Sequence, residues 1–387
     1  MKCGRGRELI LDFDVLKLYS VTNLKTEKVR YSNMKKLIPV LLALCLIAGL
    51  AACGSTPAAP ATDVPATDVP ATDVPATDTP ATDTPATEEP AAEKTYVIGI
   101  CQLVQHDALD AATAGFRDAV TAGLGADNVR FDEQNASGDS ATCSTICTGF
   151  VAANVDLIMA NATPALQAAV SATTTIPILG TSVTDYGAAL NLDFDPAEGT
   201  GTNVSGSSDG VPGQLYADLV AELLPDAQKV NILYCSAEAN SVIQADDFAA
   251  CMEDMGVATE VFTFADSNDI QMVATAAAEN CDAIYIPTDN AAASNMTIIR
   301  NITEAAGLPV ICGEENMCAN GGLATVSISY YDIGYACGQQ AVEILANGAD
   351  VGSLAIAYAQ DPVKEYNAEY AENIGFEIPE GFVAIGG

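Results

Sequence analysis

Residues 95–124 read TYVIGICQLVQHDALDAATAGFRDAVTAGL, and this stretch decides the fold class. Residues 95–102 are a short apolar run with β-branched members, which predicts a buried strand. From Ala108 to Leu124 the apolar residues recur at helical spacing, so a helix is expected directly after that strand. A strand followed at once by such a helix is the unit from which parallel sheets are built.

The same alternation continues along the chain. Further strands are expected at 129–132, 156–160 and 176–179, and then, after a break at 203–212, at 230–235, 259–264, 283–287 and 309–312. Helical patterns lie between them. We therefore expect an α/β protein with two Rossmann-like open lobes, each built on a parallel sheet, and a ligand cleft between them. The expected lobes are 94–211 plus about 329–349, and 212–328 plus about 350–387. A single large barrel gives the same alternation and stays open as an alternative.

The N-terminal region has the pattern of a lipoprotein signal. Met34-Lys35-Lys36 precedes an apolar run that ends in Leu50-Ala51-Ala52-Cys53. A basic start, a short apolar stretch and small residues at the cut are typical of a signal peptide, predicted here at 34–52. The last four residues look like a bacterial lipobox, in which Cys53 carries the lipid anchor, palmitate included. An ordinary secreted protein is the alternative. Residues 1–33 have no role in this scheme and are interpreted as a non-native upstream extension.

Residues 53–93 are predicted to form a disordered tether. Ala-Thr-Asp-Val-Pro occurs three times in 61–75 and is followed by close variants up to Pro90. A proline at every fifth position prevents a continuous helix, and the regularly spaced acids repel one another. Extended at ~3.1 Å per residue, such a segment would reach on the order of 100 Å from a membrane.

Composition excludes several classes of function. The chain holds 51 acidic and 15 basic residues, a formal charge of −36, which argues against a nucleic acid as partner. Its single histidine, His106, removes most hydrolase and metal chemistry, and we expect no catalysis, no metal and no cofactor. Residues 206–210 match the G-x-S-x-G spacing, but a histidine should follow that serine and none does. This segment is interpreted as a loop between the lobes.

Nine cysteines remain once Cys3, Cys45 and Cys53 are set aside from the 12 in the chain. Their spacing contains no C-x-x-C pair, and their odd number argues against a full disulfide framework. A local bridge between Cys312 and Cys318 stays open.

The ligand should lie at the carboxyl ends of the strands, where open α/β sheets bind their ligands. The candidate ligand-binding residues are polar or aromatic residues from these strand ends and from the start of the last long helix: Gln105, His106, Thr163, Ser182, Thr184, Asp185, Glu238, Asn240, Ser241, Asp289, Asn290, Glu314 and Tyr330. For His106 a contact to the ligand and a purely local role in its loop are equally open, and a hydrogen bond to Asp110 is an alternative. Tyr330 would supply either an aromatic wall or packing between the lobes.

Charge suggests how a small zwitterion would be held. Thr163 ends a strand and Pro164 opens a helix, so backbone N–H groups there could bind a carboxylate. Asp289 and Glu238, on the other lobe, would then bind an amine.

Several ordered motifs resemble one family. They are Ile98-Gly99-Ile100-Cys101-Gln102, His106-Asp107-Ala108-Leu109-Asp110, Val183-Thr184-Asp185, Glu238-Ala239-Asn240-Ser241, Pro287-Thr288-Asp289-Asn290 and Tyr330-Tyr331-Asp332-Ile333-Gly334. This set is similar to that of ABC-transporter substrate-binding lipoproteins, whose members include tryptophan- and tyrosine-binding proteins. The family usually has proline where Asp107 and Tyr186 stand, which bears on the ligand more than on the fold.

The resemblance implies a periplasmic-binding-protein type I fold and no catalysis. We therefore expect a lipid-anchored solute-binding protein outside the cytoplasm, on the face of the cell membrane. It would close by a hinge around a small, amino-acid-like ligand, for which an aromatic amino acid is one alternative. It would then deliver this ligand to the permease and ATPase of an importer. A monomer is expected. A surface lipoprotein that senses a ligand without transport is the alternative, and a secreted hydrolase is a third interpretation.

Overall fold

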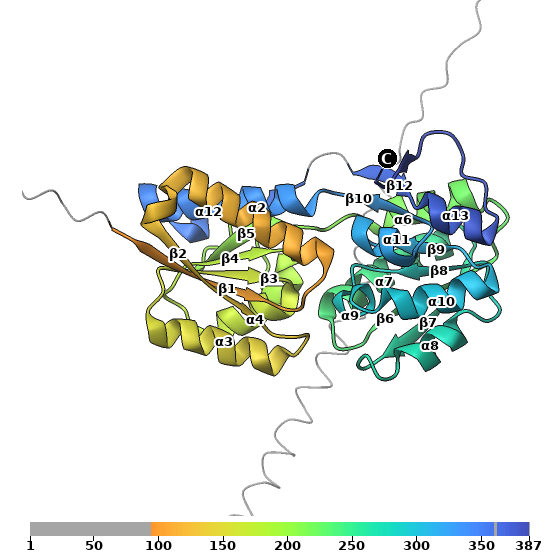
Figure 1. The fold of residues 1–387 in the computed structure, drawn as a ribbon, viewed down its shortest axis with the longest axis horizontal. Coiled ribbons are helices and arrows are strands. Elements are labelled where there is room, and N and C mark those ends of the chain that lie inside the picture. The colour runs from red at the N-terminus through yellow and green to blue at the C-terminus, as the bar shows by residue number, and fades with distance from the viewer. Residues whose placement is uncertain (1–93, 360–361, 387) are drawn as a thin grey trace, which may run out of the picture. The chain divides into compact units, whose positions relative to one another are not determined.

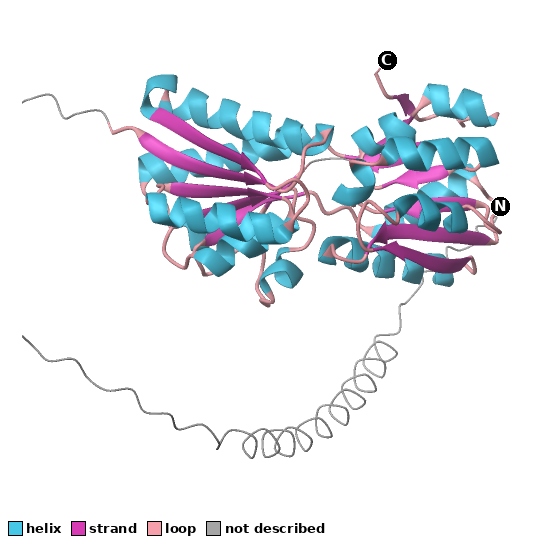
Figure 2. Cartoon of the chain, turned by 60° about the horizontal axis from the view of Figure 1, so that its bottom comes forward, coloured by secondary structure: helices cyan, strands magenta, loops and turns pink. Residues whose placement is uncertain are grey.

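The computed structural model describes residues 94–359 and 362–386. The upstream extension, the signal peptide, Cys53 and the tether all lie outside these residues. Within them the chain forms two separate sheets, so the single barrel is excluded and the predicted α/β class is confirmed. Figure 2 shows helices on both faces of each sheet. Among the described helices, none combines the length and the apolar character needed to cross a membrane.

The first sheet is entirely parallel and has the order β2-β1-β3-β4-β5-β11. Its strands are β1 (Tyr96–Gln102), β2 (Val129–Asn135), β3 (Leu157–Asn161), β4 (Ile178–Thr181), β5 (Val204–Ser208) and β11 (Ala357–Tyr358). Alternate residues of the strands face opposite sides. In β1, Ile98 and Ile100 belong to one buried cluster and Cys101 to another, so each face of the sheet has its own core.

Two groups of helices cover these faces (Figure 1). The helices of the first lobe are α2 (Asp107–Leu124), α3 (Ser140–Ala153), α4 (Thr163–Ala172), the short α5 (Tyr186–Leu190) and, from much later in the sequence, α12 (Tyr330–Asn347), with a 3-10 turn, η1 (Ala126–Asn128), before β2. Phe116 of α2 and Cys337 of α12 bury against Ile98 and Ile100, whereas Phe150 of α3 lies on the Cys101 side.

Helices α2 and α12 approach each other so closely that glycine is required at the contact. A Cβ atom on Gly115 would lie 2.1 Å from the Tyr331 carbonyl oxygen, and one on Gly334 would lie 2.0 Å from the Ala112 carbonyl oxygen. Both distances are below any real Cβ contact, and both obstacles are backbone atoms that cannot rotate away. The pairing of these two helices therefore depends on their glycines.

The second sheet has the order β7-β6-β8-β9-β10-β12-β13. Its strands are β6 (Lys229–Cys235), β7 (Ala258–Phe264), β8 (Ala283–Ile286), β9 (Val310–Cys312), β10 (Ala324–Ser327), β12 (Val363–Tyr366) and β13 (Val383–Ala384). All neighbours are parallel except β12, which runs antiparallel to β10. The accompanying helices are α6 (Gly213–Leu223), α7 (Ala239–Asp254), α8 (Ile270–Ala277), α9 (Asn290–Ala293), α10 (Met296–Ala306), α11 (Glu315–Gly321) and α13 (Ala368–Ile374).

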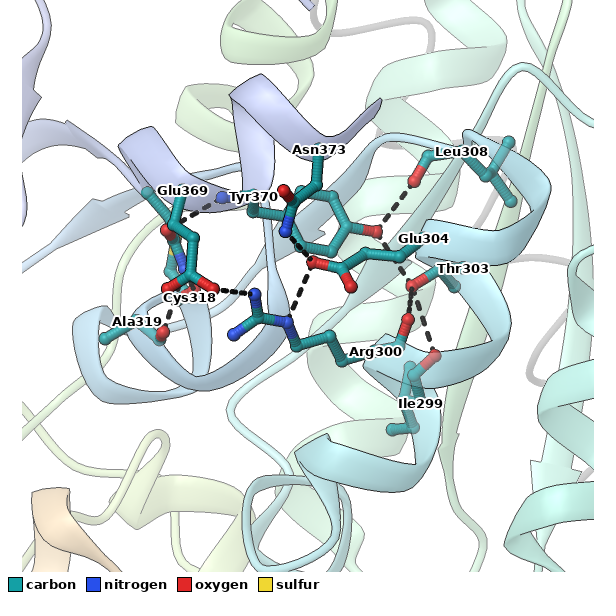
Figure 3. A network of polar contacts seen from close by, with 11 residues as sticks. Ile299, Arg300, Thr303, Glu304, Leu308, Cys318, Ala319, Glu369, Tyr370 and Asn373 are labelled. Atoms are coloured by element: carbon teal, nitrogen blue, oxygen red, sulfur yellow. Dashed lines mark hydrogen bonds and ion pairs between the residues drawn. The ribbon is translucent and has the colours of Figure 1, made fainter. Parts of the chain in front are cut away.

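The C-terminal helix α13 is fixed to the second lobe by a polar network (Figure 3). Arg300 of α10 forms ion pairs with Glu304 at 2.8 Å and with Glu369 of α13 at 2.8 Å. The buried Tyr370 hydroxyl donates to the Leu308 carbonyl oxygen at 2.8 Å. Because Tyr370 is fully buried and hydrogen-bonded, α13 is part of the second lobe's core.

Three features differ from the sequence expectation. Residues 206–210 were expected in a loop, but Val204–Ser208 is a buried strand whose register pairs Val204 with Ile178 of β4. Residues 350–358 were expected in the second lobe, but β11 pairs with β5 of the first; a 3-10 turn at Val351–Ser353, η2, leads into it. Between β8 and β9, where one helix is expected, the chain forms two helices, α9 and α10, and Asn295 precedes the second without a side-chain cap bond.

Candidate functional site

The candidate site is a pocket to which both lobes contribute at the carboxyl ends of their strands. Its cavity volume is only about 10 Å³, because side chains from both lobes fill most of the space between them. Its lining residues are His106, Leu109, Ser182, Asp209, Asn240, Thr288, Asp289, Asn290, Ala293, Glu314, Met317 and Tyr330. Most of them follow a strand or begin a helix, which is the place that parallel sheets reserve for ligands.

On the first lobe, His106 directly precedes α2 and Ser182 directly follows β4. The backbone of Ser182 is left-handed, with φ 54°, a conformation that a residue with a Cβ atom rarely adopts. Such backbone is retained where the surrounding structure imposes it, and this occurs often at ligand sites. Ser182 is 6% exposed, so its hydroxyl is held at a defined place on the wall of the pocket.

The Asp209 carboxylate connects β5 to α12. It accepts hydrogen bonds from the Thr184 hydroxyl at 3.0 Å and from the Tyr330 hydroxyl at 2.8 Å. Burial raises the pKa of Asp209 above its usual value. Since both partners are hydroxyl donors, the carboxylate is held in place without a positively charged neighbour among its hydrogen-bond partners.

On the second lobe, Asp289 is almost completely buried and fully hydrogen-bonded. Its carboxylate accepts from the backbone N–H of Ala292 at 2.8 Å and of Cys235 at 2.7 Å, and from the Ser241 hydroxyl at 2.7 Å. The first of these bonds caps α9. Burial is the main cause of a raised pKa at Asp289. This carboxylate therefore ties together the ends of β6 and β8 as well as facing the pocket.

Glu238 lies behind Asn290 and does not line the pocket. It accepts from the Asn290 backbone N–H at 3.1 Å, from the Asn290 side-chain amide at 2.6 Å and from the Ala291 backbone N–H at 2.9 Å. Burial, and secondarily the charge of Asp289, raises the pKa of Glu238 to about 8. Its carboxylate thus orients Asn290 from behind.

Glu314 does line the pocket and caps α11. It accepts from the backbone N–H groups of Asn316 at 2.6 Å and of Met317 at 2.5 Å. Burial raises the pKa of Glu314 to about 7.

Hydrogen bonds also join the two lobes beside the pocket. His106 Nε2 lies 3.1 Å from Asn290 Oδ1, and Gln244 of α7 donates to the Thr184 hydroxyl at 2.9 Å. Gln244 also bonds Thr288, both through its hydroxyl and through its backbone N–H. Thr184 and Thr288, which lie in the loops after β4 and β8, are therefore linked through one glutamine.

Three buried polar atoms of the pocket have no hydrogen-bond partner among the described residues. They are His106 Nδ1, Ser182 Oγ and Asn240 Oδ1. A buried polar atom left unpaired costs about 1–3 kcal/mol, and these three atoms are free to pair with a polar ligand. None of the lining residues is Lys or Arg.

A larger hollow of about 460 Å³ lies where the chain passes between the lobes after β10 and β11. It is lined by Ser329, Asp332, Tyr358 and neighbouring residues. In the described part of the chain, none of its lining residues carries a buried polar atom without a partner. The smaller pocket is therefore the better candidate for ligand binding.

The matching family model is described as ABC transporter substrate binding protein and covers residues 97–385. The chain belongs to the ABC transporter substrate-binding protein family. A protein named tyrosine-binding protein from Clostridioides difficile (strain R20291) is 35% identical over 264 residues, which are 67% of this chain and 75% of the relative.

Two solved structures extend the comparison for this substrate-binding protein. An ABC domain from Streptococcus pneumoniae in complex with L-Trp matches with TM-score 0.71 and 32% identity, over 76% of this chain and 100% of the other. A ligand-free, open substrate-binding protein with adhesive properties from Clostridium difficile matches with TM-score 0.59 and 34% identity, over 75% and 99%. The periplasmic-binding-protein type I fold expected from the sequence is confirmed.

Seven of the residues selected from the sequence of this substrate-binding protein line the pocket, and six do not. The seven are His106, Ser182, Asn240, Asp289, Asn290, Glu314 and Tyr330. Of the others, Thr184, Glu238 and Ser241 support lining residues from behind, and Asp185 caps α5 from an exposed position. Gln105 lies on a different hollow of the first lobe, and Thr163 is buried at the start of α4. Their roles toward a ligand remain predictions.

Asp209 is not among the residues selected from the sequence, because residues 206–210 were interpreted as a loop. The signal that could have found it is its place directly after β5, where the other strands supply lining residues. The His106 side chain bonds Asn290 rather than Asp110, whose carboxylate accepts from Gln102 instead.

The remaining chemical predictions concern metal and disulfides. Within residues 94–359 and 362–386, no three His, Cys, Asp or Glu side chains are grouped so that they could hold a metal ion. All nine cysteines of this region are free thiols, including Cys312 and Cys318, so the possible local bridge is not present.

Proposed function

We propose that this chain is the lipid-anchored, extracytoplasmic solute-binding protein of an ABC importer, and that it delivers a small amino-acid-like ligand to a membrane permease. The observation that carries the proposal is the group of unpartnered polar atoms in a pocket built by both lobes. A ligand that forms hydrogen bonds with these atoms gains affinity, because it removes the free-energy cost of leaving them buried and unpaired.

The preferred ligand class is an aromatic amino acid. The relatives named above as tyrosine-binding and as an L-Trp complex support this class. In the pocket, Leu109, Met317 and the Tyr330 ring provide apolar surface beside the polar atoms. A ligand with an aromatic side chain and a polar backbone needs both kinds of surface.

Ligand binding should stabilise the closed arrangement of the lobes. The hydrogen bonds from His106 to Asn290 and from Gln244 to Thr184 join the lobes beside the pocket. The match to the L-Trp complex also has a higher TM-score than the match to the open, ligand-free relative, at similar identity. A ligand that contacts both lobes favours closure because those contacts exist together only in the closed state.

The test begins with ligand retained by the purified chain, released by denaturation and identified by mass spectrometry. Calorimetry with L-tyrosine and L-tryptophan then measures affinity, with glycine and glucose as controls for ligands that lack the ring or the amino-acid group. X-ray scattering at saturation should show a smaller radius of gyration. Binding of glucose but of neither aromatic amino acid would contradict the proposed ligand class.

Anchoring is tested separately from binding. Cys53→Ala should abolish incorporation of labelled palmitate and release the protein from membranes. Labelled lipid that still migrates with the variant would show that the lipobox interpretation is wrong, whatever the ligand.

A further inference from the structure

His106 is the single histidine of the chain, and its ring stands between the lobes. One ring nitrogen, Nε2, lies 3.1 Å from Asn290 Oδ1, and the other, Nδ1, is a buried atom without a partner among the described residues. A neutral imidazole carries one donor and one acceptor nitrogen, so the bond at Nε2 decides what Nδ1 can do. Burial lowers the pKa of His106, which favours the neutral ring.

The orientation of the Asn290 amide follows from Glu238. Both Glu238 carboxylate oxygens already accept from backbone N–H groups, those of Asn290 and Ala291, and these donors cannot rotate away. The Asn290 side-chain nitrogen lies 2.6 Å from Glu238 Oε2. Exchanging the amide oxygen and nitrogen would place two acceptors at that distance, which is repulsive when Glu238 is ionised. At pH values above the pKa of Glu238, the Asn290 oxygen must therefore face His106.

We propose that Glu238 and Asn290 fix His106 in the Nε2–H tautomer, so that its Nδ1 atom accepts a hydrogen bond from the bound ligand. Nε2 must be the donor because Asn290 presents an oxygen to it. Nδ1 then keeps a free lone pair at the wall of the pocket. In this arrangement His106 and Asn290 lie on different lobes, so the tautomer is set when the lobes are together. Glu238 is a positioning residue, and the proposal rests on the proposed function only where it concerns the ligand.

Asn240 supports the same chemistry from the second lobe. Its side-chain nitrogen donates to the Thr288 carbonyl oxygen at 3.0 Å, and its Oδ1 atom is buried without a partner. Asp209 and Glu314 add negative charge to the lining, which contains no Lys or Arg. This wall therefore selects a ligand that brings N–H donors and positive charge. A protonated primary amine meets that requirement, whereas a carboxylate placed here would be repelled.

The first experiment needs no ligand. The chain is produced with ¹⁵N-labelled histidine and without a histidine tag, so that the spectrum contains one imidazole. At pH 9, above the pKa of about 8 at Glu238, Nδ1 should show the shift of an unprotonated nitrogen and Nε2 that of a protonated one. X-ray scattering of the same sample shows whether the lobes are together, as the contact between His106 and Asn290 requires. In protein with the lobes together, a protonated Nδ1, or averaging between the two tautomers, would overturn the proposal.

A pair of variants separates positioning from general stability. Glu238→Gln lets the Asn290 amide turn over, and we expect the two imidazole nitrogens to show averaged or mixed shifts. Glu253→Gln, on the exposed end of the same helix α7, removes an equal charge and should leave the wild-type shifts unchanged. A pure Nε2–H tautomer in folded Glu238→Gln would contradict the positioning role, and the wild-type spectrum decides the tautomer even if that variant does not fold.

The ligand arm uses L-tyrosine as probe, and L-tryptophan if calorimetry detects no binding of L-tyrosine. On saturation the Nδ1 resonance should move toward the protonated type while Nε2 stays in place, because Nδ1 has become an acceptor. The analogue 3-(4-hydroxyphenyl)propionate, which lacks the amine of tyrosine, should bind at least about 30-fold more weakly. An amino acid that binds without moving Nδ1 overturns the contact. If neither amino acid binds, the aromatic ligand class of the proposed function fails, and the ligand-free spectrum decides the tautomer in protein whose scattering shows the lobes together. Lobes that stay apart under all these conditions would also overturn the proposal.

Discussion

The same dipeptide, Thr-Asp, lies in the loop after one strand in each lobe, and its two aspartates have different surroundings. Asp185 follows β4, is exposed and accepts one hydrogen bond, from the Ala188 backbone N–H at 2.9 Å. Asp289 follows β8, is 1% exposed and accepts three. Both cap a short helix. The difference teaches that a carboxylate at the end of a strand can be a simple cap in one lobe and a structural junction in the other.

The two threonines of these pairs contact each other across the lobes, unlike the two aspartates. Thr184 and Thr288 come from different lobes, and their hydroxyl oxygens lie 3.5 Å apart, both bonded to Gln244. Thr184 also donates to Asp209 of the pocket. Similar residues at two strand ends therefore meet at the boundary between the lobes, while the aspartates beside them act within their own lobes.

The largest effect is expected from Asp289→Ala. It leaves two buried backbone N–H groups and the Ser241 hydroxyl without an acceptor, so the free energy of unfolding should fall by about 2–5 kcal/mol. Urea unfolding followed by circular dichroism measures the change. Asp289→Asn, which keeps one acceptor oxygen, should lose less. A ligand-free Asp289→Ala protein as stable as wild type would restrict Asp289 to a ligand role and remove the contrast with Asp185.

The pH dependence tests the buried carboxylates of the second lobe. The pKa of Glu314 is raised to about 7 in the fold, from 4.5, so the folded state binds its proton more tightly than the unfolded state does. Its contribution to stability is therefore full below pH ~4.5 and is lost as the pH rises to about 7. At 1.36 kcal/mol per pKa unit, the loss is up to ~3 kcal/mol.

Glu314→Gln should remove that part of the pH dependence. The stability difference between variant and wild type, measured by urea unfolding at pH 4.5 and pH 8, should shift in favour of the variant at the higher pH. Glu372→Gln, exposed on α13, is the control and should show no such shift. An identical pH profile of stability for Glu314→Gln and wild type would show that burial does not raise the pKa of this carboxyl group.

A smaller effect, on binding, is expected from the threonines. Thr184→Val removes a donor to the Asp209 carboxylate, and hydrogen bonds to charged groups contribute about 1.5–3 kcal/mol, so the Kd for L-tyrosine should rise about 10-fold or more. Thr288→Val keeps the bond from the Thr288 backbone N–H to Gln244, and its effect should stay below about 10-fold. Calorimetry of both variants gives the comparison. Equal increases in Kd for the two variants would mean that the hydrogen bond from Thr184 to Asp209 adds nothing to binding.

The smallest effect is expected from Asp185→Ala. Loss of one exposed helix cap costs about 1 kcal/mol. Urea unfolding under the conditions used for Asp289→Ala makes the two values comparable. If Asp185→Ala lowered the free energy of unfolding as much as Asp289→Ala, burial would not explain the difference between the two capping aspartates.

The sequence was sufficient for the parts of the fold that carry a periodic apolar pattern. Helix α2 and strands β1 and β6 lie within a few residues of their predicted bounds. Strand β5 was missed because Val204-Ser-Gly-Ser-Ser has little apolar character. It is a strand because β4 pairs with it and because the buried Ser207 hydroxyl finds Thr181. A tertiary partner of this kind cannot be read from local sequence.

The candidate site was predictable in position but less so in the role of each residue. Placing polar residues at strand ends identified His106, Ser182 and Asn240, which carry the unpartnered atoms. The same rule also selected Asp185 and Glu238, whose hydrogen bonds are satisfied inside one lobe. Whether a side chain has a free lone pair depends on its three-dimensional neighbours, and the sequence does not contain that information.

The return of α12 to the first lobe has a consequence for synthesis. Cys337 and Ala341 complete the core against Ile98 and Ile100, and β11 adds the last strand of that sheet. A ribosome makes β1 to β5 first, yet these strands cannot bury their α12-facing surface until the whole of β6 to β10 has been translated. Domains often fold in the order of synthesis, but here such an order is blocked by the path of the chain. The first lobe is therefore completed only after most of the second lobe has been made, and β12, β13 and α13 of the second lobe follow last.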